Sequence, residues 1–572
     1  MDMRLAVWGL LTEAALAAFP ALDEADLPQP DSLEVPPDSR LGDFAFPCFR
    51  LAKPLRLAPN KIAEGIAGAA NRPELASAQA VGGYVNFFFH RGNFAKAVLE
   101  DVLKQGANYG SLPPQGKTVV LDYSSINIAK RFHIGHLSTT VIGHSLKRIY
   151  THLGWQAIGI NYLGDWGTQF GKMIAAFKRW GDWQMLEEGG VEALNALYVR
   201  FHREEENNPE LTEEGRAWFR KIEEGDREAT DIFNRFKALT LAYAQTVYEQ
   251  LGITFDSYNG EAFFNDKMGR VIDELKAKDL LKQDKGAFVV DLEDYKMPPC
   301  LILKSDGATL YATRDLAAAL WRKDTYHFDQ CLYVVAYQQN LHFQQVFKVL
   351  ELMGHDWART QMKHVAFGMV SFEGQAMSTR EGNVVHLDEL LARAREKARD
   401  IMLVKSPNLT DTRELDQAAR SVGIGAVVFT TLLNNRIKDI DFWWDRALNF
   451  DGDTGPYVQY AHARCCSVLA RAGEIGDAPD YSVLENDEAQ ALLRLLSRFP
   501  EAIQSAMADA EPSYVTRAAL DLAKAFNKYY YEHRILEGEP GEIKARLNLT
   551  RAARDVIALG LYLIGVDAPQ QM

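Results

Sequence analysis

The chain has 572 residues, of which 47% are hydrophobic and 24% are charged, and its formal net charge is −14. This length predicts about three or four domains, and the composition is that of an ordinary globular protein. No apolar run approaches the ~18 residues that a membrane span needs, which excludes a membrane protein. The five cysteines include no C-x-x-C pair, which argues against a disulfide framework or a zinc knuckle and favours a reducing cytoplasm.

The first 115 residues predict a small α+β domain. The apolar start, Met1 to Pro20, lacks a cationic segment followed by a cleavage site, and we expect a first helix there. An amphipathic helix near Pro59 to Ala70 and a strand at Gly83 to Phe89 follow, and the turn Pro113 to Gly116 closes the domain. The segment Arg40 to Arg72 carries six bases against two acids, although most such charge runs are solvated faces.

From residue 116 onward the pattern is that of a Rossmann-type nucleotide-binding fold. A strand at Thr118 to Ser125, a helix at Leu137 to Leu153 and a strand at Ala157 to Tyr162 form a βαβ unit, which predicts a parallel sheet. Strand signals return at Cys331 to Ala336 and His364 to Met369. The sheet is therefore interrupted by a mostly helical, charged insertion.

Helical periodicity continues from about residue 390 to the end and predicts a helix bundle. The expected fold is thus α/β with added domains. An N-terminal α+β domain (1–115) precedes a Rossmann domain (116–390) with its insertion at about 165–300, and an all-α region (391–572) ends the chain.

The string His133-Ile134-Gly135-His136 lies at the junction between the first strand of the βαβ unit and its helix. Phosphate binds at such junctions, because the exposed N–H groups and the positive dipole end of the helix attract it. The two histidines lie about one turn apart on one face, and Gly135 lets a flat adenine approach the backbone. A pair of ordinary surface or core histidines is the alternative.

A split parallel sheet with His-x-Gly-His at its first crossover resembles the class I aminoacyl-tRNA synthetases. Within that class, the segment from Asp122 to Lys130 (DYSSINIAK) is similar to the arginyl-tRNA synthetases. The other segments that agree with this family are LGDFA (41–45), GDWGTQ (164–169), YATRD (311–315), MSTR (377–380) and APQQM (568–572). The resemblance therefore covers essentially the whole chain.

The resemblance implies an arginine–tRNA ligase. ATP and L-arginine would form arginyl-adenylate and pyrophosphate, and the 2′-OH of the terminal ribose of tRNA(Arg) would then take the arginyl group. Mg²⁺ would accompany ATP, and we expect no tightly bound metal. We also expect a cytoplasmic monomer without a membrane partner.

The planar, always charged guanidinium of arginine requires carboxylate oxygens in a fork geometry. Tyr311 and Asp315 lie four residues apart at the start of a helical stretch, and they match the family's arginine-binding tyrosine and aspartate. Asp122 matches an acidic position that faces the same guanidinium. Without the flanking motifs, a surface helix pair would be the better explanation of Tyr311 and Asp315.

Three more residues match positions that hold the α-amino and carboxylate groups of the amino acid in this family. They are Ser125, Asn127 and Gln339, with Gln338 as the alternative if the register is off by one. Loop capping is the other explanation of these side chains, and it suits Ser125 better than Asn127.

For ATP, the resemblance implies binding by His133, Gly135 and His136, whose histidines would donate to the triphosphate as negative charge builds on it. The second class I signature is a Lys-Met-Ser-Lys loop. Here the matching residues are Met377, Ser378, Thr379 and Arg380, and both lysines are missing. Lys130 is the family's proposed substitute, with Arg380 as a helper, and an ordinary solvated lysine is the alternative.

RNA contacts are predicted at both ends of the chain. Tyr84 and Asn86 match N-terminal residues that read an unpaired base at the tRNA elbow, and a plain strand would explain them equally well. Tyr457 and Arg464 lie on helices that resemble the anticodon-binding bundle, and Met572 matches the family's terminal methionine near the anticodon.

Two other functions stay open at this point. One is another class I enzyme or a small-molecule adenylyltransferase with the same histidine motif, against which Tyr311, Asp315 and the helical C-terminal region argue. The other is a non-catalytic RNA-binding paralogue, which the two missing lysines allow.

Overall fold

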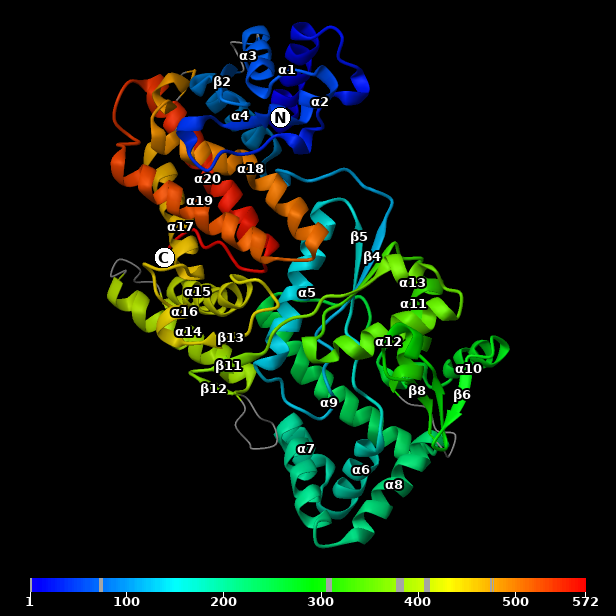
Figure 1. Cartoon of the computed structure of the whole chain (residues 1–572). Coiled ribbons are helices and arrows are strands. Elements are labelled where there is room, and N and C mark those ends of the chain that lie inside the picture. Colours follow the sequence, from blue (N-terminus) through cyan, green and yellow to red (C-terminus); the bar gives the residue numbers. More distant parts are fainter. Residues whose placement is uncertain are drawn as a thin grey trace.

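A four-stranded parallel sheet lies at the centre of the structure, and helical lobes extend from it (Figure 1). The computed structural model describes residues 3–70, 72, 76–304, 311–376, 385–405, 412–473, 476 and 478–572. Within these ranges, no helix is both long enough and apolar enough to cross a membrane.

The N-terminal residues form a three-stranded antiparallel sheet with helices packed against it. The elements are α1 (Met3–Ala18), β1 (Phe44–Pro47), α2 (Ala52–Leu55), α3 (Pro59–Ala69), β2 (Ala76–Val81), β3 (Tyr84–Phe89) and α4 (Arg91–Gln105). β3 is the central strand, and its alternate residues Val85, Phe87 and Phe89 are buried. The first helix, the amphipathic helix and the strand predicted from the sequence are confirmed.

The central sheet has the strand order β10-β9-β4-β5, and all neighbours are parallel, as the βαβ pattern predicts. The elements are β4 (Thr118–Asp122), α5 (Gly135–His152), β5 (Gln156–Ile160), α11 (Tyr311–Tyr326), β9 (Gln330–Tyr333), α12 (Asn340–Leu352), α13 (Trp357–Gln361) and β10 (Met362–His364). Helix α5 packs closely on the end of β4, because Gly143 has no side chain. A Cβ atom there would lie 2.2 Å from the ring of Tyr123.

The last strand of this sheet lies earlier in the sequence than predicted. We expected it at His364 to Met369, but β10 ends at His364. The chain still pairs beside β9 and its extension after that residue, since the N–H of Val365 donates to the carbonyl of Tyr333 at 2.8 Å and Phe367 forms an isolated parallel bridge with Ala336. The N–H of Gly368 then donates to the carbonyl of Arg436 at 2.8 Å. Val365 and Phe367 are buried whereas Met369 is 41% exposed, and the pairing beside β9 explains why this stretch resembles a strand.

The insertion between β5 and α11 forms the helical lobe at the bottom of Figure 1 and a small antiparallel sheet at its right. Its elements are α6 (Thr168–Trp180), α7 (Trp183–Glu205), α8 (Pro209–Glu223), α9 (Arg227–Leu251), α10 (Met268–Ala277), β6 (Leu281–Asp284), β7 (Ala287–Val290) and β8 (Cys300–Leu303). Its mostly helical character is confirmed, but the sequence reasoning missed the sheet. β6 is an edge strand with mostly exposed residues, so it shows no apolar alternation.

The C-terminal region is a helix bundle, as predicted, with a small sheet at its beginning. The elements are β11 (Val370–Phe372), β12 (Gln375–Ala376), α14 (Leu387–Lys405), α15 (Thr412–Leu432), β13 (Ile440–Phe442), α16 (Trp444–Ala447), α17 (Gly455–Ala472), α18 (Asp487–Asp509), α19 (Ser513–Glu532) and α20 (Pro540–Leu563). Leucine, alanine and phenylalanine side chains fill the space between α18, α19 and α20.

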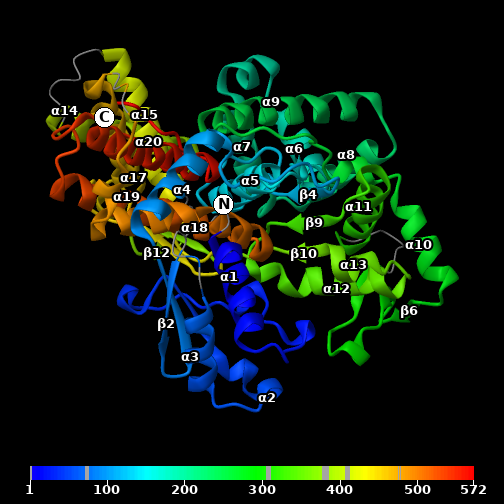
Figure 2. The same ribbon diagram turned by 90° about the horizontal axis from the view of Figure 1, so that it is seen from above.

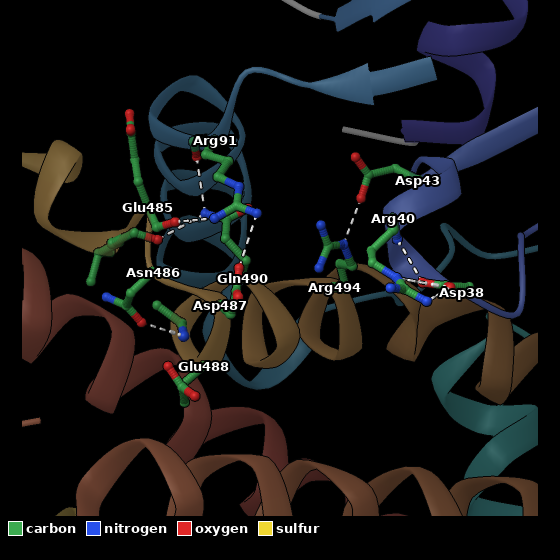
Figure 3. Close-up of polar contacts among 12 residues, drawn as sticks. Asp38, Arg40, Asp43, Arg91, Glu485, Asn486, Asp487, Glu488, Gln490 and Arg494 are labelled. Carbon is green, nitrogen blue, oxygen red and sulfur yellow. Dashed lines mark hydrogen bonds and ion pairs between the residues drawn. The ribbon is translucent and has the colours of Figure 1, made fainter. Parts of the chain in front are cut away.

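The N-terminal domain packs against this bundle, although the two lie at opposite ends of the sequence (Figures 1 and 2). Figure 3 shows the polar contacts at this junction, where Arg494 of α18 pairs with the buried Asp43 at 2.5 Å. Arg91 of α4 pairs with Asp487 at 3.0 Å. Asp43 belongs to the segment LGDFA, and the Asp43–Arg494 pair gives this segment a structural role between the two ends of the chain.

Candidate active site

The histidine motif follows a loop with an unusual backbone. Between the end of β4 and the start of α5, Ser124, Ser125 and Ala129 have φ angles of 72°, 47° and 63°. Residues with a side chain rarely adopt such values, and they persist only where surrounding contacts hold them. Strained positions of this kind cluster at functional sites, so the geometry agrees with the place predicted for the site.

The two histidines of the motif are neutral donors. The Nδ1 atom of His133 accepts from the N–H of Gly135 at 3.1 Å, and Nδ1 of His136 accepts from the N–H of His133 at 3.2 Å. Burial lowers the pKa of His133 to about 4 and that of His136 to about 3. A neutral ring whose Nδ1 accepts must carry its proton on Nε2. Each ring therefore keeps one N–H that can donate to a phosphate oxygen.

Gly135 has a further role that the sequence did not reveal. A Cβ atom at this position would lie 2.8 Å from Cε1 of His133, closer than real contacts allow. The glycine thus makes room for the imidazole of His133.

The segment Met377, Ser378, Thr379 and Arg380 lies outside the described residues. The chain that follows it returns to the histidine motif. The N–H of Ile134 donates to the carbonyl of Val385 at 3.0 Å, and the N–H of Leu387 donates to the carbonyl of Phe132 at 3.0 Å. Helix α14 therefore begins directly beside the motif.

Two of the predicted arginine ligands lie on α11. Tyr311 is its first residue and is 69% exposed, and Asp315 lies one turn later. An Oδ2 atom of Asp315 contacts Nε2 of His342, on α12, at 2.6 Å. Gln339 and Gln338 are exposed in the turn that follows β9 and precedes α12. Since β9 and β4 are parallel neighbours, their carboxyl ends place these residues at one edge of the sheet.

Asp122 is already occupied by a cation of the chain itself. It is 4% exposed, it forms an ion pair with the buried Arg322 at 2.8 Å, and it accepts a hydrogen bond from Oγ of Ser125 at 2.9 Å. Burial raises the pKa of Asp122, and Arg322 opposes the rise. The contact of Asp122 with a substrate guanidinium stays a prediction. The structure shows that its carboxylate neutralises the buried charge of Arg322.

Asn127 is exposed at the same loop, and a glycine determines its place. It forms an isolated bridge with Gly164, where a Cβ atom would lie 2.2 Å from Oδ1 of Asn127. The segment GDWGTQ (164–169) therefore packs against the loop that carries Asn127. Ile126, which precedes Asn127, is buried.

Sequence reasoning missed an acid beside Asp315. Glu261 has a side chain that is 16% exposed, and it lies 3.7 Å from the guanidinium of Arg314. Burial, together with Asp315 and Asp165, raises the pKa of Glu261 to about 7, although Arg314 opposes the rise. Glu261 begins a 3-10 helix of only four residues, Glu261–Phe264, which is too short to show a periodic pattern in the sequence. The only signal was indirect, because the buried Asp165 of the GDWGTQ motif accepts a hydrogen bond from the N–H of Ala262 at 2.8 Å.

The predicted anticodon-binding residues lie together around a cavity of about 1070 Å³. Tyr457 and Arg464 of α17 line it together with Met572 at the chain end and with Tyr530 and Tyr531 of α19. The guanidinium of Arg464 lies 4.9 Å and 5.1 Å from the ring centroids of these two α19 tyrosines. Such an array of aromatic rings and a cation suits the stacking of nucleic acid bases.

At the N-terminal domain, the two predicted residues differ in access. Tyr84 is 37% exposed, whereas Asn86 is buried, with 4% exposed. Phe49, which the sequence reasoning missed, is 56% exposed and lies edge-to-face with Tyr84 at 5.7 Å. An aromatic surface is thus present, and a base-reading role for Asn86 stays a prediction.

Comparison with known proteins agrees with this geometry. The model of the class I (R) tRNA synthetase catalytic domain matches residues 98–444, the arginyl-tRNA synthetase N-terminal domain matches residues 11–89, and the DALR anticodon-binding domain matches residues 458–572. The arginine–tRNA ligase of Alkaliphilus metalliredigens is 50% identical over 95% of this chain and 96% of its own length. That of Clostridioides difficile is 51% identical over 94% of this chain and 95% of its own length.

Solved structures give the same result. The arginyl-tRNA synthetase of Thermus thermophilus superimposes with a TM-score of 0.82 at 28% identity, and all of both chains is covered. The Plasmodium falciparum arginyl-tRNA synthetase shares the fold, with a TM-score of 0.81 at 22% identity over 100% of this chain and 99% of that one. The chain therefore belongs to the arginyl-tRNA synthetases, within class I.

Proposed function

We propose that this arginyl-tRNA synthetase activates L-arginine at the carboxyl edge of the central sheet. The amino acid would lie between two acids, Asp315 of α11 and Glu261 of the insertion, and the histidines at the N-terminus of α5. A carboxylate oxygen of arginine attacks the α-phosphorus of ATP, the bond to the bridging oxygen breaks, and pyrophosphate leaves. The 2′-OH of tRNA(Arg) then attacks the acyl carbon of arginyl-adenylate, and AMP leaves.

The excess of carboxylate at this edge is the observation that carries the proposal. Asp315 acts electrostatically on both Asp122 and Glu261, whose pKa values burial raises. A guanidinium in contact with Asp315 and Glu261 would add to the positive charge of Arg314, in the fork geometry that arginine offers. Tyr311 would close the pocket, while Ser125, Asn127 and Gln339 would hold the α-amino and carboxylate groups.

ATP would lie at the N-terminus of α5, where His133 and His136 donate through Nε2 and Gly135 leaves room. Mg²⁺ enters with ATP as part of the substrate. Lys130 is exposed. Burial of the two histidines is the main cause that lowers their pKa values, and the charge of Lys130 is a smaller one. The ammonium of Lys130 therefore acts electrostatically at the histidine motif. This charge would stabilise the negative charge of the transition state in place of the missing lysines.

For tRNA(Arg), we assign the anticodon to the cavity around Arg464 and Met572 and the elbow to the surface around Tyr84. Deletion of Met572 should then raise the tRNA KM by about one to two decades, as for the loss of one stacked or hydrogen-bonded base. An unchanged KM in aminoacylation assays would remove the chain end from the anticodon site. We also propose that the protein is cytoplasmic and that it acts as a monomer. A monomer suffices because both assigned tRNA-binding regions lie on one chain, and light scattering at assay concentration tests it.

The experiment that tests the proposal is ATP–pyrophosphate exchange by the full-length protein with arginine or lysine, with and without tRNA(Arg). We expect exchange with arginine and a preference over lysine of about 10⁴-fold, because an ammonium leaves the acceptors of the fork unpaired. Equal exchange with both amino acids would contradict the acidic pocket. No exchange with arginine, even with tRNA present, would favour a non-catalytic RNA-binding protein.

A further inference from the structure

Lys130 and Arg131 are adjacent basic residues with opposite surroundings. Lys130 is exposed, whereas the side chain of Arg131 is only 13% exposed. The guanidinium of Arg131 contacts Asp388 at 2.8 Å and Glu389 at 3.0 Å, both in the first turn of α14, and Glu192 of α7 at 3.4 Å. One side chain thus joins the loop before the histidine motif to the insertion and to the C-terminal region.

The residues on either side of Lys130 are also held. The N–H of Ala129 donates to Oγ1 of Thr240, a fully buried residue of α9, at 3.0 Å. Ala129 has a φ of 63°, a conformation that requires such support. Phe132 is buried, and its carbonyl accepts from the N–H of Leu387. The backbone of Lys130 therefore lies between an attachment to α9 and the attachments of Arg131.

Two of the three ion pairs of Arg131 add little to global stability. The side chains of Glu192 and Glu389 are 68% and 63% exposed, and ion pairs with exposed partners contribute little to the stability of a fold. Burial lowers the pKa of Arg131, but its contacts with Asp388 and Tyr243 outweigh burial and raise the pKa above its ordinary value. The planar guanidinium stays charged and can contact both helices at once, which a lysine cannot do in the same way.

We propose that Arg131 is a positioning residue for arginine activation: by attaching its loop to α7 and α14 it fixes the place of Lys130. The inference rests on the proposed role of Lys130 in activation. The guanidinium of Arg131 is taken up by Asp388, Glu389 and Glu192, so in this proposal its effect passes through the residues of the loop.

The experiment compares Arg131→Met, Arg131→Lys, Lys130→Ala and the double variant K130A/R131M in pyrophosphate exchange by the full-length enzyme with tRNA(Arg). Arg399→Met is the matched control, since Arg399 pairs with Asp416 at 3.0 Å and lies on α14, well away from the motif in sequence. Loss of a supporting contact should lower kcat by about 10- to 100-fold in R131M, with an arginine KM within about twofold of the wild type. The kcat of R131K should lie between those of R131M and the wild type, and the kcat of R399M should match that of the wild type.

The double variant decides whether Arg131 acts through Lys130. If it does, K130A/R131M should be no more than about twofold slower than K130A, because the group to be positioned is already absent. Multiplying effects of the two substitutions, or a wild-type kcat in R131M, would overturn the inference. If R131M does not fold, R131K in the same two backgrounds decides by the same criteria. A wild-type kcat in K130A would contradict instead the proposed function of Lys130, and with it any role of Arg131 in placing that lysine.

Discussion

Two acids at the carboxyl edge of the central sheet, Asp122 and Asp315, are held in very different ways. Asp122 ends β4, is 4% exposed, and forms a buried ion pair with Arg322 at 2.8 Å. Asp315 lies on α11, where its side chain is 25% exposed and contacts Nε2 of His342 at 2.6 Å. A buried carboxylate needs its permanent cation, whereas a half-exposed one can take a cation from a ligand.

Residue type alone does not separate an acid that supports the fold from an acid that can bind a substrate. Burial and the permanent partner make that distinction. We therefore call Asp122 and Arg322 the floor of the proposed arginine pocket, and Tyr311, Asp315 and Glu261 its rim. Substitutions in the floor should change stability, and substitutions in the rim should change the binding of arginine.

The largest effect is expected in the floor. Arg322→Met leaves Asp122 buried without its cation, which should lower the free energy of unfolding by about 3–5 kcal/mol. The double variant D122N/R322M should regain most of this loss, because neither charge is then buried. Urea denaturation measures the free energy of unfolding of both variants. A loss in R322M of less than about 1 kcal/mol, as for an exposed pair, would break the distinction between floor and rim.

Asp315→Asn should have the next largest effect, and on binding instead of stability. Removing one partner of a desolvated ion pair costs about 2–5 kcal/mol, and we expect this cost mainly as a higher KM for arginine, with a much smaller change for ATP. Asp324→Asn on the same helix is the matched control, since Asp324 pairs with Arg270 at the surface. Equal increases of both KM values in pyrophosphate exchange would remove Asp315 from the amino-acid pocket.

Glu261 should give the rim a pH dependence. Its pKa is raised to about 7 by burial and by Asp315 and Asp165, against the opposing effect of Arg314. At pH 6 the group is mostly protonated, and at pH 8 it is mostly ionised and can bind a guanidinium. The arginine KM should therefore fall by up to about tenfold as the pH rises from about 6 to 8.

Glu261→Gln is the control for this pH effect. In that variant the arginine KM should be higher than in the wild type and nearly constant over the same pH range. If the wild-type KM did not change with pH, or if the slope persisted in the variant, another group would be responsible.

The smallest effect is expected at the most exposed part of the rim. Tyr311→Phe removes one neutral hydroxyl from a residue that is 69% exposed. A neutral hydrogen bond contributes about 0.5–1.5 kcal/mol, which corresponds to about a two- to tenfold higher arginine KM. The thermal unfolding temperature should stay that of the wild type. A change in stability without a change in KM would assign Tyr311 to packing.

The amino-acid sequence by itself determined the features that depend on local geometry. The place of His133, Gly135 and His136 at a strand-to-helix junction follows from the βαβ pattern, and the spacing of Tyr311 and Asp315 follows from the helical repeat. Neighbouring residues obey these repeats whatever the rest of the chain does, which is why the parallel sheet, the helical insertion and the bundle could be predicted as well.

Only the tertiary structure decided which distant residues meet and which groups stay charged. Three pairs join positions that share no periodicity in the sequence: Arg322 with Asp122, His342 with Asp315, and Arg314 with Glu261. These residues meet because the strand order of the sheet brings them to one edge. The pKa values of about 3 to 4 for the two histidines of the motif and about 7 for Glu261 arise mainly from burial. Burial is a property of the packed chain, so no local pattern in the sequence could have supplied it.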